Sequence, residues 1–156
     1  MPVADANHFL TAVGHRLGVC NRPFRQEGYG LELDGRLVAV AISASIVNGP
    51  VAGFERQEVV ELARLAAAEP WANRVMLRLW REVCAQKWKS WPVKAAISYS
   101  HNAMHRGDIY RFDGWERVRD DCGTSGGGGG WSRPRYATQV VAGSKTLWVW
   151  RFSDAA

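Results

Sequence analysis

The chain lacks the cysteine pairs that stabilise small secreted domains or bind zinc. Cys20, Cys84 and Cys122 form an odd, widely spaced set without a CxxC pair, so a disulfide framework or a cysteine metal site is not expected. The sequence also contains no HExxH motif, and we predict no metal cofactor. This cysteine usage is typical of a protein that works inside the cell.

Long hydrophobic runs and a targeting segment are missing as well. The first ten residues have neither the basic start nor the apolar centre of a signal peptide. The longest apolar run, residues 37–47, includes two serines and is too short to cross a bilayer. We therefore expect a soluble, cytoplasmic protein that has no membrane partner.

The composition is that of one globular domain. The chain has 156 residues, of which 47% are hydrophobic and 22% charged, which excludes a disordered chain and allows a core of its own. Its net charge of +5 favours an anionic partner such as nucleic acid or a polyphosphate cofactor. Solubility alone is the simpler explanation of the charge, and the composition does not decide between the two.

Apolar periodicity predicts an alternation of helices and strands. Asp5 and Gly18 are the expected ends of a first helix, and Asp34-Gly35 between apolar runs predicts a hairpin. This order indicates one α/β (α+β) domain over residues 1–156. After the hairpin the pattern predicts a strand (58–66), a helix (72–87), a strand (93–100), a short helix ending at Gly114, and strands at 115–121 and 145–152.

A glycine-rich segment, residues 123–136, separates the last two expected strands. Five consecutive glycines favour a mobile loop, because glycine loses much conformational freedom in regular structure. The loop ends in Trp131, Arg133 and Arg135. These side chains are suited to contact a nucleic-acid phosphate and to stack on an extruded base. The alternative is a surface loop with an anchoring tryptophan.

The most informative stretch is a strand that breaks at Glu69-Pro70-Trp71 and leads into a helix. A helix start exposes backbone N–H groups and the positive end of a dipole, which suits a phosphate-bearing ligand. In this helix one expected face is apolar, and a second face carries arginines that are either solvated or in contact with phosphate. The apolar face comprises Val75, Met76, Leu79, Trp80 and Val83, and the other face Arg74, Arg78 and Arg81.

The segment YRFDGW, residues 110–115, matches the Tyr-x-x-x-Gly-aromatic signature of the GNAT N-acetyltransferases. The resemblance covers roughly residues 5–118 and implies a twisted mixed sheet, flanked by helices and splayed between the strands at 58–66 and 93–100. It implies acyl transfer from acetyl-CoA or another acyl-CoA to an amino group. Tyr110 would protonate the leaving thiolate, Glu61 would accept the proton of the amine, and His105 would act as a base or contact the substrate. The alternatives are that Tyr110 is a core aromatic residue packed against the helix, and that Glu61 is a strand carboxylate paired with Arg64 or another arginine.

The same resemblance implies a set of donor-binding residues. They lie on the strand and at the start of the following helix: Ala63, Leu65, Ala72, Asn73 and Arg74. The family usually has Gln/Arg-x-x-Gly-x-Gly/Ala in this turn, whereas this chain has Glu69-Pro70-Trp71 and no glycine. Proline removes a backbone donor, although Ala72 and Asn73 can still present theirs.

Several shorter motifs resemble phage Mom-type DNA-modification proteins, a GNAT-like branch. They are Glu61-x-x-Arg64, Asn73, the HxGxxY of residues 105–110, and the Trp-x-Arg-Pro-Arg of residues 131–135. This resemblance implies modification of a DNA base without acetyl-CoA, with Arg64, Asn73 and Arg133 near the site. A catalytically inactive DNA- or anion-binding module is the third hypothesis.

Two further pairs of residues are candidates for the site. Ser98 and Ser100 share one face of their strand and could hold the substrate, or could be buried hydroxyls bonded to the backbone. His101 and His105 are four residues apart and could share a helical face.

Overall fold

The computed structural model describes residues 1–47, 49–122 and 143–152. The predicted glycine-rich loop, with Trp131, Arg133 and Arg135, lies outside these residues. No helix in the described ranges is long and apolar enough to span a membrane. The helices are α1 (Val3–Ala12), α2 (Pro70–Leu79) and α3 (Asp108–Asp113), and the strands are β1 (Gln26–Leu33), β2 (Arg36–Ala44), β3 (Val59–Ala67), β4 (Ala95–His101), β5 (Glu116–Cys122) and β6 (Lys145–Arg151).

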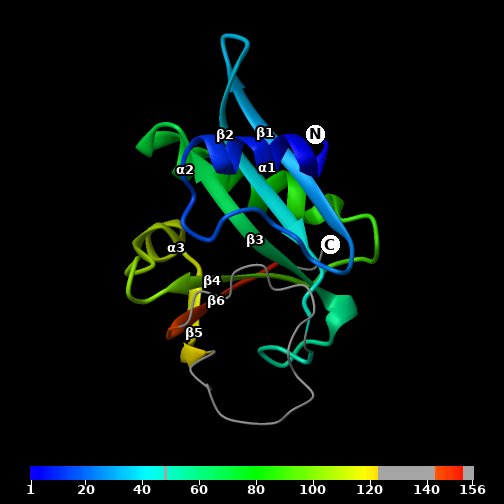
Figure 1. Ribbon diagram of the computed structural model, residues 1–156. Helices are drawn as coiled ribbons and strands as arrows, with labels where there is room; N and C mark the ends of the chain where they lie inside the picture. Colours follow the sequence, from blue (N-terminus) through cyan, green and yellow to red (C-terminus); the bar gives the residue numbers. More distant parts are fainter. Residues whose placement is uncertain (48, 123–142, 153–156) are drawn as a thin grey trace.

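The strands form a six-stranded mixed sheet in the order β1-β2-β3-β4-β6-β5. β3 and β4 are parallel, and the other neighbouring strands are antiparallel. The predicted α+β domain with a mixed sheet is thereby confirmed. Helices cover both faces: α1 lies in front of β1 and β2, and α2 packs behind β2 and β3 (Figure 1).

The hairpin between β1 and β2 turns at Asp34-Gly35, as predicted. Both residues have positive φ, 51° and 75°, which is the conformation of the two-residue turns that match the twist of paired strands. The loop is short, so the register of β1 on β2 is set locally.

The predicted bounds of the first helix are wrong. The helix begins at Val3, with Pro2 rather than Asp5 before its first turn, and it ends at Ala12 rather than near Gly18. Gly14 adopts a φ of 64°, which breaks the helical path, and the His15 N–H bonds back to the Leu10 carbonyl (2.9 Å). The segment after α1 is therefore free to fold over the sheet.

The predicted apolar face of α2 divides into two faces. Met76 and Trp80 are buried, and the Trp80 indole N–H donates to Ser43 Oγ (2.8 Å). Val75, Leu79 and Val83 are exposed instead. The buried face comprises Ala72, Met76, Leu77 and Trp80, spaced so that they meet the sheet together.

Arg81 does not share an exposed face with Arg74 and Arg78, as the sequence suggested. It is 4% exposed, its Nε donates to Asp113 Oδ2 (2.8 Å), and its guanidinium carbon lies 3.7 Å from the centre of the Trp150 ring. The partners come from α3 and β6, so this arginine ties the end of the α2 region to both elements.

Candidate active site in the splay between two parallel strands

The site is built where β3 and β4 separate. The two strands pair from Val59 and Ala95 to Leu62 and Ser98, and then each continues without the other, as expected for a splayed sheet. Figure 1 shows the two strands diverging beyond this point. A cavity of about 570 Å³ lies in the opening, lined by β3, the start of α2, β4, α3 and the segment after α1. Backbone groups and side chains of five elements therefore converge on one space.

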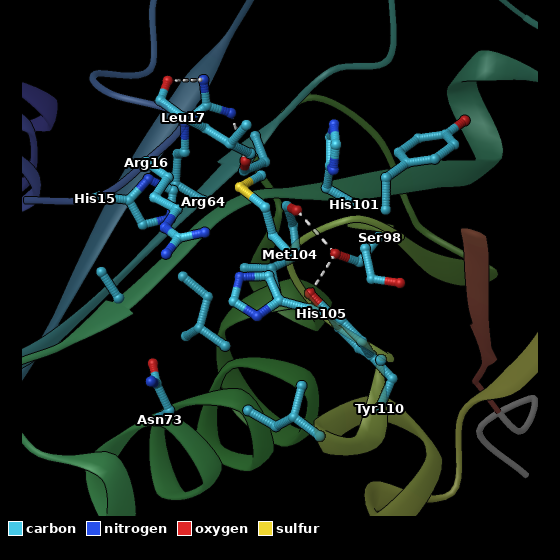
Figure 2. A pocket seen from close by; sticks show the side chains of 18 of the residues that line it. His15, Arg16, Leu17, Arg64, Asn73, Ser98, His101, Met104, His105 and Tyr110 are labelled. Carbon is cyan, nitrogen blue, oxygen red and sulfur yellow. Dashed lines mark hydrogen bonds between the residues drawn. The ribbon is translucent and has the colours of Figure 1, made fainter. Parts of the chain in front are cut away.

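The Tyr110 hydroxyl lies where β3 and β4 begin to separate. Its Oη lies 2.8 Å from Ser98 Oγ, and Ser98 Oγ donates to the Leu62 carbonyl (3.1 Å), a chain drawn with dashed lines in Figure 2. A serine hydroxyl has one hydrogen, so in this arrangement Tyr110 donates to Ser98. The three groups link α3, β4 and β3 at the position where pairing ends.

The Tyr110 ring is held by two tryptophans. It stacks on Trp148 (5.6 Å between ring centres) and meets Trp115 edge-on (5.4 Å). Burial raises the pKa of Tyr110 well above its usual range, because the phenolate would lose its hydration. At neutral pH the side chain is a protonated phenol, in the state needed to give a proton away.

Gly107 allows α3 to approach β6. It has a φ of 73°, and a Cβ at this position would lie 2.3 Å from Trp148 Cζ2. The Trp148 indole N–H in turn donates to Ser100 Oγ (2.8 Å). Ser100 lines the cavity but is bonded to this indole, so its expected role in holding substrate stays a prediction.

Glu61 approaches the splay from the other face of the sheet. Side chains alternate along a strand, and its neighbour Leu62 packs in the cluster that contains Tyr110. Glu61 is 5% exposed and is not among the residues that line the cavity. Burial raises the pKa of Glu61, and the Arg22 guanidinium, 2.5 Å from its Oε1, opposes this shift.

Arg22 is a residue that the sequence did not single out. It lies in the segment after α1, 39 residues before its partner, and no local motif marks the pair. Arg64, which the sequence placed near the substrate, lines the cavity. Its guanidinium donates to the carbonyls of Leu17 (3.2 Å), Gly18 (3.1 Å), Val19 (3.3 Å) and Ala63 (2.7 Å). Arg64 therefore holds the segment after α1 against β3.

The predicted donor-binding residues do not all line the cavity. Ala63, Leu65 and Asn73 line the cavity, whereas Ala72 is fully buried and Arg74 is exposed. Asn73 Oδ1 is buried without a hydrogen-bond partner, so an N–H group entering the cavity would satisfy it. Figure 2 shows Asn73 on α2, across the cavity from the loop that carries His105.

The start of α2 does not fit a diphosphate. Pro70 is the first helical residue and has no N–H group, and the Ala72 N–H is bonded to the Glu69 carbonyl (3.1 Å). The N-cap residue Glu69 has a side chain without a hydrogen-bond donor, and its carboxylate pairs with Arg36 at 3.9 Å. The cavity is lined by polar side chains, among them Asn73 and Ser98, that can bond the amide groups of a thioester arm. The residues thus suit the arm of acyl-CoA but not its nucleotide end.

His15 is a second cavity residue that the sequence did not single out for the site. It lies in the segment after α1, near Arg64, as Figure 2 shows, and its Nδ1 is buried without a hydrogen-bond partner. Burial, aided by the Arg64 charge, lowers the pKa of His15 to about 4. Its imidazole is therefore neutral at pH 7.

The pairing of His101 with His105 on one helical face is wrong, because His101 ends β4. His105 lines the cavity from the loop before α3. Within the described ranges, no group of three His, Cys, Asp or Glu side chains is arranged to hold a metal ion.

The pKa of His15 predicts a pH-dependent stability. Between pH 6.5 and about pH 4 the unfolded chain binds a proton that the folded chain does not, so the unfolding free energy falls as the pH falls. Solvent screening at this partly exposed position reduces the contribution to about 1–2 kcal/mol. Urea unfolding of wild type and His15→Asn should show a steeper loss for wild type below pH 6.5 and parallel curves above pH 7. Equal slopes below pH 6.5 would contradict the assignment.

No protein-family model matches the sequence, and no curated protein is significantly similar to it. Among solved structures, the ribosomal-protein-S18-alanine N-acetyltransferase from Escherichia coli superimposes with a TM-score of 0.63 at 12% identity, over 100% of this chain and 93% of that one. The ribosomal-protein-alanine N-acetyltransferase from Brucella melitensis gives 0.61 at 16% identity, over 97% of both chains. A GNAT family acetyltransferase from Elizabethkingia anophelis with acetyl-CoA bound gives 0.51 at 14%, over 81% and 76%. The chain has the fold of the GNAT acetyltransferases.

Proposed function

We propose that the protein transfers an acyl group from a thioester to an amino group. The observation that carries this proposal is the buried Tyr110 hydroxyl at the point where β3 and β4 separate, beside a cavity open to an extended ligand. A thioester arm lying between the two strands would bring its sulfur toward this hydroxyl. A purely apolar ligand would suit this region less well, because it would leave Asn73 Oδ1 and His15 Nδ1 without hydrogen-bond partners.

The reaction needs one proton donor and one proton acceptor. The amine nitrogen attacks the thioester carbonyl, a C–N bond forms, the C–S bond breaks, and the thiolate takes the proton of Tyr110. The nitrogen loses its extra proton to Glu61 through water, and solvent restores the phenol. The pKa shift of Glu61, raised by burial against the pull of Arg22, increases its tendency to accept that proton.

Ser98 acts as a positioning residue. Its Oγ accepts from Tyr110 and donates to the Leu62 carbonyl, which aims the phenol at the end of the splay. The Leu62 carbonyl and the Glu61 side chain are adjacent in sequence but face different sides of the strand. We propose that the thioester enters on the Tyr110 side and the amine on the Glu61 side.

The acceptor is a separate question. Two structural neighbours are ribosomal-protein alanine N-acetyltransferases by name, which makes a peptide N-terminal amine a reasonable first acceptor. Modification of a DNA base stays a prediction, because Trp131, Arg133 and Arg135 lie outside the described residues.

The test is release of free thiol coupled to amide formation. The protein is incubated with acetyl-pantetheine or acetyl-CoA at millimolar concentration and either a peptide with a free N-terminus or duplex DNA. Thiol is measured with a chromogenic reagent, and the acceptor mass by mass spectrometry. We expect an increase in acceptor mass by one acetyl group with equimolar thiol. No protein-dependent thiol release with either donor would overturn the proposal.

A further inference from the structure

The outer face of α2 carries a row of large apolar side chains. Trp71, Val75 and Leu79 on α2 and Val83 in the π-helical turn that continues it (Trp80–Cys84), here called the α2 stripe, recur every four residues and are 47%, 40%, 41% and 42% exposed. We infer, on the basis of the proposed acyl transfer, that the thioester arm is carried by an acidic protein which docks on the α2 stripe, and not by a nucleotide.

The stripe begins at the end of α2 that borders the cavity, although it points to the other side of the helix. Trp71 and Asn73 lie in the first turn of α2; Asn73 lines the cavity between β3 and β4, whereas Trp71 two residues earlier faces outward. At a rise of 1.5 Å per residue the stripe extends about 18 Å along the helical axis. Four large apolar side chains in a continuous row on a surface helix are typical of a binding face rather than of scattered exposure. The arm of a partner seated there would have to pass around the first turn of α2 to reach the cavity.

The positive charge around the α2 stripe favours an acidic partner. Arg74 and Arg78 are exposed beside it, while the two nearby carboxylates are paired, Glu69 with Arg36 at 3.9 Å and Glu82 with Arg81 at 2.5 Å. The whole chain has a net charge of +5. An apolar row flanked by arginines is complementary to an acidic surface with apolar residues. A second copy of this chain would instead bring arginines together, which is unfavourable.

The helix start supplies the argument against a nucleotide carrier. A nucleotide-borne thioester needs backbone N–H donors for its diphosphate, and Pro70 together with the bonded Ala72 N–H removes two of them. A protein-borne phosphopantetheine arm has a single phosphate and gains most of its affinity from the protein that carries it.

Calorimetry with three donors tests the inference. Acetyl-CoA and acetyl-pantetheine should bind with dissociation constants within about threefold of each other, because the nucleotide adds nothing. An acidic acyl carrier protein with an acetyl-phosphopantetheine arm should bind at least about tenfold tighter. Acetyl-CoA binding more than about tenfold tighter than acetyl-pantetheine overturns the inference but supports acyl transfer. If none of the three donors binds, the proposed function fails as well.

Variants locate the docking face. Val75→Glu should weaken binding of the carrier protein about tenfold or more, because it places a carboxylate and removes an apolar contact in the middle of the stripe. Binding of acetyl-pantetheine should not change. The matched control is Val118→Glu, since Val118 on β5 is 37% exposed and outside the stripe. Equal weakening by both variants, no effect of Val75→Glu, or a stripe-dependent dimer in light scattering would overturn the assignment.

Discussion

Replacement of Tyr110 by phenylalanine is expected to lower kcat by about 10²–10⁴-fold, which is the typical contribution of a positioned general acid. The thiolate would then leave without a proton from the protein. Because the ring keeps its stacked contact with Trp148 and its edge-on contact with Trp115, the variant should fold normally. Loss of its hydrogen bond to Ser98 should cost about 1 kcal/mol of unfolding free energy. Thiol release at saturating donor measures kcat, and urea unfolding measures the stability.

The matched control is Tyr29→Phe. Tyr29 lies on β1, is also partly buried, and its hydroxyl donates to Glu27 Oε2 (2.7 Å), outside the cavity. It should lose a similar amount of stability and keep its kcat. The acid role of Tyr110 would be excluded if Tyr110→Phe retained more than about a third of the wild-type kcat, or if both variants lost activity equally.

Replacement of Gly107 by alanine should lower the unfolding free energy by about 2–4 kcal/mol, more than Tyr110→Phe or Gly35→Ala. Two costs add at this position. Positive φ is strained for a residue with a side chain, by about 1 kcal/mol. The new Cβ would also meet the buried Trp148 ring at 2.3 Å, and overpacking against a rigid ring costs about 1–3 kcal/mol. The displaced indole should weaken its bond to Ser100 and loosen the support of Tyr110.

Gly35→Ala separates the two costs. Gly35 has nearly the same φ, 75°, but a Cβ there meets nothing within 4 Å. It should lose only the conformational part, about 1 kcal/mol. The difference between the two variants in urea unfolding then reports the contact with Trp148. If both variants lose the same stability, the close approach of α3 to β6 is not what requires a glycine at position 107.

Local patterns were enough to predict the parts of the fold that depend on neighbouring residues. Asp34-Gly35 predicts its hairpin because two adjacent residues that tolerate positive φ determine the turn. The YRFDGW segment is a local motif too, and its tyrosine does face the splay, bonded to Ser98. The sequence also predicts the missing backbone donor in the turn Glu69-Pro70-Trp71, because proline has no N–H group.

Patterns failed where distant elements decide the environment of a residue. The apolar residues of α2 were expected on one face, but Val75 and Leu79 are exposed while Met76 and Trp80 are buried. Arg81 was expected at the surface, but Asp113 and Trp150 bury it. Helical spacing predicts which residues share a face of the helix, but it does not predict which face packs against the sheet.

The candidate site likewise combines features that follow from local sequence with contacts that only the folded chain creates. The sequence alone determined the order of elements, the hairpin, the tyrosine motif and the absence of a glycine turn, because each follows from residues within a few positions of one another. Only the tertiary structure decided the partners of those residues: Arg22 on Glu61, Ser98 on Tyr110, and the α1 segment with His15 beside Arg64. The hydrogen bond from Arg64 to the Leu17 carbonyl, for example, joins residues 47 positions apart. The energies of such contacts depend on burial and distance, which exist only once the chain has folded.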